Sequence, residues 1–236
     1  MADGHSAMLC STLLLLLLSI LFPHNVNGWL PFFGKPSWIA ARRQTNIVIP
    51  DEVLTSRNTT ALYTLMNALI DSSGPEPVVV RSRDDLCGAW EVVCTRPGPR
   101  GEPQWVKYSK FLSSASGGPR QEATVNRNFQ LFSPDGTFVN LSEYASTSFY
   151  ATASGTFTLN LPEGTVPQVT ATVDNVRVHF GLPAAALSLG VSGTGFVCVR
   201  FLDARNGLRV FENEDGAQVL QRRLAAVPTE YASFLR

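Results

Sequence analysis

The chain has 236 residues, of which 44 % are apolar, so it can bury a sizeable core and is not disordered throughout. Its 19 basic and 19 acidic residues cancel. This balance excludes the strongly basic surface that is expected of a nucleic-acid-binding protein.

Residues 1–28 are predicted to be a signal peptide. Six consecutive leucines lie between Thr12 and Phe22, and an apolar run of about 11 residues is too short to span a bilayer comfortably. Val26 and Gly28 occupy the small-residue positions of a cleavage site. An uncleaved membrane anchor is the alternative, because the first residues include Asp3 and no Lys or Arg.

Residues 29–50 are basic and free of acidic residues, with Lys35, Arg42 and Arg43 behind an aromatic opening at Trp29. Such a composition is typical of a plastid transit peptide. A signal peptide followed by this segment resembles the two-part leader of plastid proteins in algae with secondary plastids. The alternative is a flexible linker on a secreted protein.

An amphipathic helix is expected next, from Asp51 to Asp71. Its apolar residues recur every three to four positions, and Gly74, Pro75 and Pro77 end it. Such a helix can close one end of a barrel or dock on the core.

Beyond Arg83 the apolar pattern changes to a period of two, which predicts strands. The clearest strand runs from Phe149 to Leu161, and the next run, Val169 to Phe180, changes phase at Asp174-Asn175, which predicts a bulge or a tight reversal. The other predicted strands are Trp90–Thr95, Gln104–Leu112, Thr124–Phe132, Thr137–Leu141, Phe196–Leu202, Leu208–Glu212 and Ala217–Arg222. Eight or nine strands with short turns indicate an antiparallel barrel or sandwich.

No residue pattern indicates an enzyme, a metal site or a cofactor. A Gly-x-Ser-x-Gly elbow is missing, and His179 alternates with apolar neighbours as a solvated strand residue would. The glycine-rich stretch Gly190–Gly195 lacks the P-loop lysine and is predicted to be a turn. Asp84-Asp85 is expected to cap a helix or form a turn.

The body contains three cysteines, Cys87, Cys94 and Cys198. An odd number argues against a disulfide framework, and buried thiols are expected. A Cys87–Cys94 bridge is disfavoured because residues so spaced on one strand lie about 20 Å apart.

Aromatic and apolar residues on the predicted strands are candidates for lining a ligand cavity. They are Trp90, Trp105, Tyr108, Phe149, Phe157 and Leu159. The alternative is that they fill a closed core. Two sequons, at Asn58 and Asn140, permit glycosylation if the chain passes through the secretory route.

Two blocks carry a resemblance to a known family. Leu86-Cys87-Gly88-Ala89-Trp90 leads into apolar residues and Thr95, and Phe201-Leu202-Asp203 is followed by an Asn206-Gly207 turn and Leu208-Arg209. They resemble the first barrel strand and the C-terminal signature of the plastid lipid-associated proteins, or plastid fibrillins. Phe201 stands where that family usually has Tyr.

The resemblance assigns residues 51–236 to one fibrillin-like domain and implies a mainly β, lipocalin-like antiparallel barrel behind the N-terminal helix. It implies a non-enzymatic plastid protein that binds or shelters prenylquinones, carotenoids or fatty acids at plastoglobules or thylakoid membranes, with no cofactor and no nucleic-acid partner. Asp203, Gly207 and Arg209 are interpreted as architectural, and Asp203 and Arg209 are expected to pair across the hairpin. The alternatives are a secreted or membrane-tethered β-sandwich that recognises partners through its loops, and an enzyme of the same fold acting on a pigment or oxygenated lipid.

Overall fold

The computed structural model describes residues 49, 51–55, 58–74, 78–99, 125–144, 149–180, 186–190 and 192–235. These belong to one compact unit, Asn46–Arg236. The predicted signal peptide and all of the predicted transit segment except residue 49 lie outside the described residues. The predicted strand Gln104–Leu112 does so too.

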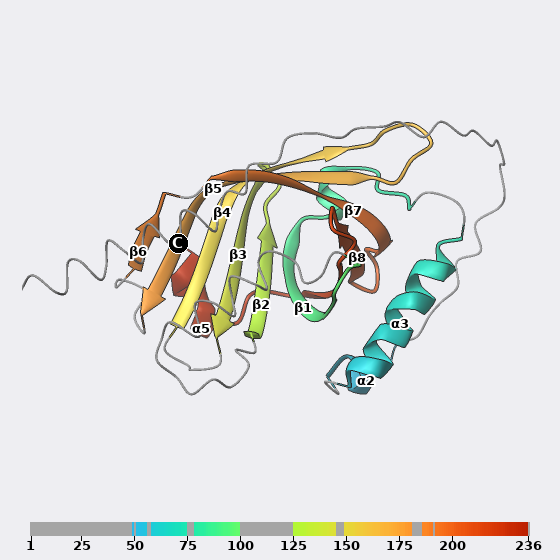
Figure 1. Cartoon of the computed structure of the whole chain (residues 1–236), viewed down its shortest axis with the longest axis horizontal. Coiled ribbons are helices and arrows are strands. Elements are labelled where there is room, and N and C mark those ends of the chain that lie inside the picture. Colours follow the sequence, from blue (N-terminus) through green and yellow to red (C-terminus); the bar gives the residue numbers. More distant parts are fainter. Residues whose placement is uncertain are drawn as a thin grey trace, which may run out of the picture. The chain divides into compact units, whose positions relative to one another are not determined.

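Nine antiparallel strands form a single sheet in the described part of the chain. They are β1 (Gly88–Arg96), β2 (Val125–Phe132), β3 (Thr137–Tyr144), β4 (Phe149–Asn160), β5 (Gln168–Phe180), β6 (Ala186–Leu189), β7 (Gly193–Asp203), β8 (Leu208–Asn213) and β9 (Gln218–Leu224). Their order is β4-β3-β2-β1-β9-β8-β7-β5-β6, and pairing of β4 with β5 closes eight of them into a ring (Figure 1). The prediction of a mainly β fold with eight or nine antiparallel strands is confirmed.

Each predicted strand that falls on described residues is present, whereas β6 was not predicted. β6 pairs with the second half of β5, beyond the point where β7 leaves that edge. The phase change at Asp174 is a β-bulge: Ser154 pairs with Asn175 and Gly155 with Val173, which leaves Asp174 without a counterpart. The first of the two predicted alternatives, a bulge, is therefore confirmed.

Alternate residues of each strand point into the ring, because side chains alternate between the two faces of a sheet. Seven of the eight ring strands contribute to one core cluster on this inner face. Its buried strand residues are Trp90, Phe132, Phe138, Phe157, Val169, Val199 and Phe211. We call this side of the sheet the inner face and the opposite side the outer face.

Two helices, α2 (Asp51–Thr55) and α3 (Thr59–Ser72), precede the sheet. α3 begins at Asn58, whose Oδ1 accepts a hydrogen bond from the Ala61 amide at 3.1 Å. The side chains of Leu62, Met66 and Leu69 are buried because their spacing places them on one side of the helix.

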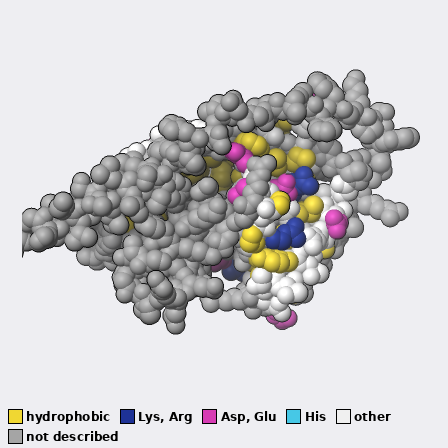
Figure 2. All heavy atoms as spheres, viewed as in Figure 1, with side chains coloured by type: hydrophobic (Ala, Val, Ile, Leu, Met, Phe, Trp, Pro, Cys, Tyr) yellow, Lys and Arg dark blue, Asp and Glu magenta, His cyan; other side chains and the backbone are white. Residues whose placement is uncertain are grey.

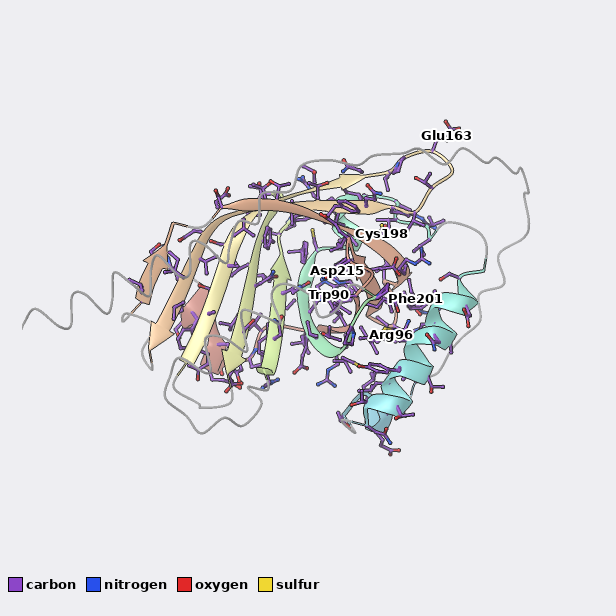
Figure 3. The ribbon with its side chains drawn as sticks, viewed as in Figure 1. Trp90, Arg96, Glu163, Cys198, Phe201 and Asp215 are labelled. Atoms are coloured by element: carbon purple, nitrogen blue, oxygen red, sulfur yellow. The ribbon has the colours of Figure 1, made fainter. Side chains whose placement is uncertain are left out.

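α3 lies on the outer face rather than closing an end of the ring. Its buried side chains pack against Val210 and Leu220, which alternate with inward-pointing residues of β8 and β9. Phe201 of β7 packs against the same cluster, and Figure 3 shows it on the side of β7 that approaches α3.

The C-terminal segment covers another part of the outer face. It consists of α5 (Thr229–Ala232) and η2 (Ser233–Leu235), a turn of 3-10 helix. Tyr231 and Phe234 pack on Phe129 of β2 and Leu141 of β3. The outer face is therefore apolar where α3 and α5 lie on it, which a simple alternation of apolar and polar residues does not predict.

Figure 2 shows acidic, basic and apolar side chains next to one another on the small described part of this face. No helix among the described residues is long and apolar enough to cross a bilayer.

Candidate functional site

One part of the inner face is organised around a fully buried guanidinium, that of Arg209 in β8. Its Nε donates to Gln221 Oε1, its Nη1 to the Leu86 carbonyl at 3.1 Å, and its Nη2 to Gln130 Oε1 at 3.2 Å. Gln221 Nε2 in turn donates to Gln130 Oε1 at 2.7 Å. Each nitrogen of the guanidinium thus has a neutral oxygen as its partner.

Aromatic rings enclose this cation. The Arg209 Cζ atom lies 4.0 Å from the ring centroid of Trp90, 4.3 Å from that of Phe211 and 4.7 Å from that of Phe132. Ring faces attract a cation, which offsets part of the cost of removing it from water. Burial, and then the nearby charge of Arg223, still lowers the pKa of Arg209 well below its ordinary value.

The same arrangement connects distant parts of the chain. The Leu86 carbonyl accepts from Trp90 Nε1 at 2.9 Å as well as from Arg209. Leu86 directly follows η1 (Arg83–Asp85), a 3-10 helix, so Arg209 ties the β8 strand to the segment that enters β1. We call this region the aromatic half; it contains Trp90, Phe132, Phe138, Phe157, Phe211 and Arg209.

The hairpin between β7 and β8 corrects one sequence-based expectation. Asp203 does not pair with Arg209: its carboxylate accepts hydrogen bonds from the amides of Arg205 and Asn206 within the turn, at 3.1 and 3.0 Å. Arg209 lies opposite Leu202 of β7 and Gln221 of β9 in the strand register. Leu202 packs against the inner core cluster, so Arg209 also points to the inner face. Gly207 has φ 66°, which explains a glycine at the end of this turn.

The predicted cavity residues are distributed unevenly. Trp90, Phe157 and Leu159 meet in the core cluster of the ring, where Trp90 is 0 % and Phe157 2 % exposed. Trp105 and Tyr108 lie outside the described residues. Phe149 begins β4, but its side chain is not among those described. The described candidates therefore belong to a filled core, which was the alternative interpretation.

The rest of the inner face is different in character. We call it the amide half, and it contains Asn128 of β2, Asn140 and Ser142 of β3, and Ala151 and Ala153 of β4. Register places them on one face, because Asn128 pairs with Ser142, Asn140 with Ala153, and Ser142 with Ala151. Gln130, the partner of Asn140, joins the amide half to the Arg209 network.

Two polar atoms of the amide half are buried without a partner among the described residues. They are the Oδ1 atoms of Asn128 and Asn140. Asn128 Nδ2 donates to Ser142 Oγ at 2.8 Å, which fixes one side of that amide. Buried polar groups are hydrogen-bonded in the great majority of cases, so two neighbouring exceptions indicate a missing partner.

The amide half was not predicted as a site, because its residues are short and most are polar rather than aromatic. The sequence does contain a signal for it, since the period-two pattern places Asn128 and Gln130 on the same face as Phe132.

The two sequons differ in their access to a glycosylating enzyme. Asn58 is exposed at the N-cap of α3. Asn140 points into the ring and has a buried Oδ1. Glycosylation of the folded chain is therefore compatible with Asn58 and not with Asn140.

The histidine prediction was wrong. His179 is 3 % exposed, its Nε2 lies 3.2 Å from Thr152 Oγ1, and its ring meets that of Phe234 at 5.2 Å. Alternation along β5 correctly places His179 on the outer face, away from the core cluster. The C-terminal segment covers the outer face at this point, so the side chain is buried rather than solvated.

The remaining carboxylates and thiols form no further site among the described residues. Asp85 caps η1 by accepting from the amides of Arg81 and Ser82, as expected for this pair of aspartates. Cys87, Cys94 and Cys198 are free thiols, and burial raises the pKa of Cys94 to about 11. No group of three His, Cys, Asp or Glu side chains in the described ranges is arranged to hold a metal ion.

Comparison with known proteins found no match for this chain among protein-family models, curated proteins or solved structures. Membership of the plastid lipid-associated family therefore stays a prediction from the two sequence blocks.

Proposed function

We propose that this protein is a non-enzymatic carrier that shelters a hydrophobic small molecule in the amide half of a lipocalin-like barrel. The observation that carries the proposal is a pair of buried amide oxygens without a partner among the described residues, beside the short side chains of Ser142, Ala151 and Ala153. The interior of a barrel of about eight strands is either filled by its own side chains or holds one small ligand.

Burial supports the same location. In the aromatic half, Trp90 and Phe157 leave almost no surface exposed. In the amide half, Ala151 and Ala153 are only half-buried, although they lie on the inner face of the sheet. Apolar ligand surface placed against them gains about 25 cal/mol per Å² removed from water.

Co-purification tests the proposal. The protein is incubated with a plastid lipid extract and re-purified, and the bound molecules are identified by mass spectrometry. We expect one quinone, carotenoid or fatty-acyl compound per chain, recovered chemically unchanged. An empty but folded protein would contradict the proposal, and a converted ligand would favour the enzyme alternative.

The proposal includes a plastid destination, reached through the secretory route. A fluorescent protein fused behind residues 1–50 is expected to reach the plastid of an alga with a secondary plastid. Secretion of the fusion would favour the secreted recognition module instead.

A specific feature favours that second candidate function. The β4–β5 hairpin carries Leu161, 51 % exposed, and Figure 3 shows Glu163 at the tip, pointing away from the ring. Leu161→Ser is expected to leave ligand uptake unchanged if the interior is the site. However, all nine described strands belong to one continuous sheet rather than to the two sheets of a sandwich.

A further inference from the structure

We propose that the molecule held in the amide half is a neutral amphiphile with a hydroxyl group, and that the site discriminates against carboxylate anions. This inference rests on the proposed function and narrows its ligand from lipids in general to one chemical class.

The hydrogen-bonding capacity of the site calls for a donor. The Oδ1 atoms of Asn128 and Asn140 are acceptors, and both are buried without a partner among the described side chains and backbone. Asn128 is 7 % exposed, so water reaches it poorly. A hydroxyl group both donates and accepts, so it satisfies a carboxamide in either orientation of its oxygen and nitrogen, whereas a carboxylate only accepts.

The charges around the site do not favour an anion. Arg209 is a buried cation of the inner face, but its nitrogens already donate to the neutral oxygens of Gln221, Leu86 and Gln130. Arg223 lies at the same end, where its Nη2 donates to the Cys87 carbonyl at 2.8 Å. An ionised carboxylate in the amide half would lose its water without gaining a cationic partner, which is costly.

The neighbouring strands supply a surface for the hydrocarbon part. Ala151 and Ala153 lie beside the amides in register, and Val176 and Val178 of β5 pair with them on the same face. The site is therefore polar along β2 and β3 and aliphatic along β4 and β5. A molecule with one hydroxyl and an apolar chain or ring system matches both surfaces.

A matched pair of fluorescent probes tests this inference. The full-length chain is titrated at pH 8 with cis-parinaric acid and with the alcohol of the same polyene chain, which differ only at the head group. We expect the alcohol to bind at least tenfold more tightly than the acid. Equal affinities, or tighter binding of the acid, would overturn the inference while leaving the carrier function intact.

Variants then locate the head group. Asn128→Leu and Asn140→Leu are each expected to weaken binding of the alcohol about tenfold and to leave binding of the acid within twofold. Asn160→Leu is the matched control, because Asn160 is exposed on the outer face, where its Nδ2 donates to Thr170 Oγ1. Unchanged affinity of the two inner variants would contradict the assignment.

Failure of the carrier function gives a different result. In that case neither probe binds saturably to the unmodified chain. If an inner variant does not fold, as judged by circular dichroism, competition on the unmodified chain replaces it. Hexadecanol is then expected to displace the bound alcohol at a concentration at least tenfold lower than palmitate, and the reverse order would overturn the inference.

Discussion

The two halves of the inner face use polar groups in opposite ways. In the aromatic half, each guanidinium nitrogen of Arg209 has an oxygen partner and three rings surround it. In the amide half, two buried amide oxygens have no partner among the described residues. A satisfied buried network rigidifies a core, whereas an unpaired buried polar group is costly. We therefore propose that the aromatic half stabilises the fold and that the amide half binds the ligand.

The largest loss of stability is expected from removing the buried guanidinium of Arg209. Arg209→Leu removes the donor of Gln221 Oε1 and one of the two donors of both the Leu86 carbonyl and Gln130 Oε1. It also leaves space in the core, so we expect a loss of about 3 kcal/mol in the free energy of unfolding. Urea denaturation measures it. Arg200→Leu is the control, since Arg200 is partly exposed and pairs with Glu212 at 3.5 Å; it is expected to cost less than about 1 kcal/mol. Equal effects would show that the aromatic half is not the stabilising region.

Enlarging side chains tests whether the two halves are equally filled. Val199→Phe is expected to destabilise the fold by about 1–3 kcal/mol, because Val199 is 0 % exposed and packs within the core cluster. Ala153→Leu adds volume to the amide half and is expected to cost less than about 1 kcal/mol. It should nevertheless reduce binding of the polyene alcohol at least tenfold. An Ala153→Leu variant that binds normally would place the ligand elsewhere.

The boundary between the halves contains a close backbone contact. A Cβ atom on Gly155 would lie 1.9 Å from the Thr172 carbonyl oxygen, beside the bulge at Asp174. Gly155→Ala is expected to cost about 1–3 kcal/mol, since the two strands must move apart. Gly190→Ala is the control, because nothing lies within 4 Å of the added atom. Thermal unfolding followed by circular dichroism compares the two, and equal melting temperatures would contradict this contact.

The smallest change in the free energy of unfolding is expected from removing one hydrogen bond on the outer face. Tyr231 donates to Glu143 Oε2 at 2.8 Å, and burial, followed by this bond, raises the pKa of Tyr231 to about 12 from an ordinary value of 10.0. The raised pKa means that this stabilisation is complete below pH 10 and is lost as the pH rises toward 12. Tyr231→Phe is expected to cost about 1 kcal/mol at pH 8 and to flatten the fall in stability between pH 10 and 12. Unchanged pH dependence would contradict the assignment, and ligand binding at pH 8 should not change.

The sequence predicted the strands of the sheet better than it predicted the faces of those strands. The period-two pattern from Phe149 to Phe180 located β4, β5 and even the bulge at Asp174, because each residue's face depends only on local geometry. β6 was missed since four residues are too few to establish a period.

The site could not be predicted in the same way, since both faces of the sheet are covered. His179 and Arg209 each stand between apolar neighbours, a pattern that suggests a solvated side chain when one face meets water. His179 lies instead under the C-terminal segment, and Arg209 points inward because α3 covers Val210 on the outer face. Which covering element lies over which strand depends on contacts between segments far apart in the sequence.

Side-chain amide resonances test the central claim most directly, namely that the ligand binds in the amide half. The chain is labelled with nitrogen-15, the Nδ2 signals of Asn128, Asn140 and Asn160 are assigned by substitution, and the polyene alcohol is added stepwise. We expect the signals of Asn128 and Asn140 to shift together and to saturate at one ligand per chain, while Asn160 and the indole signal of Trp90 stay in place. Saturating shifts at Trp90, with none at the two inner asparagines, would contradict the account.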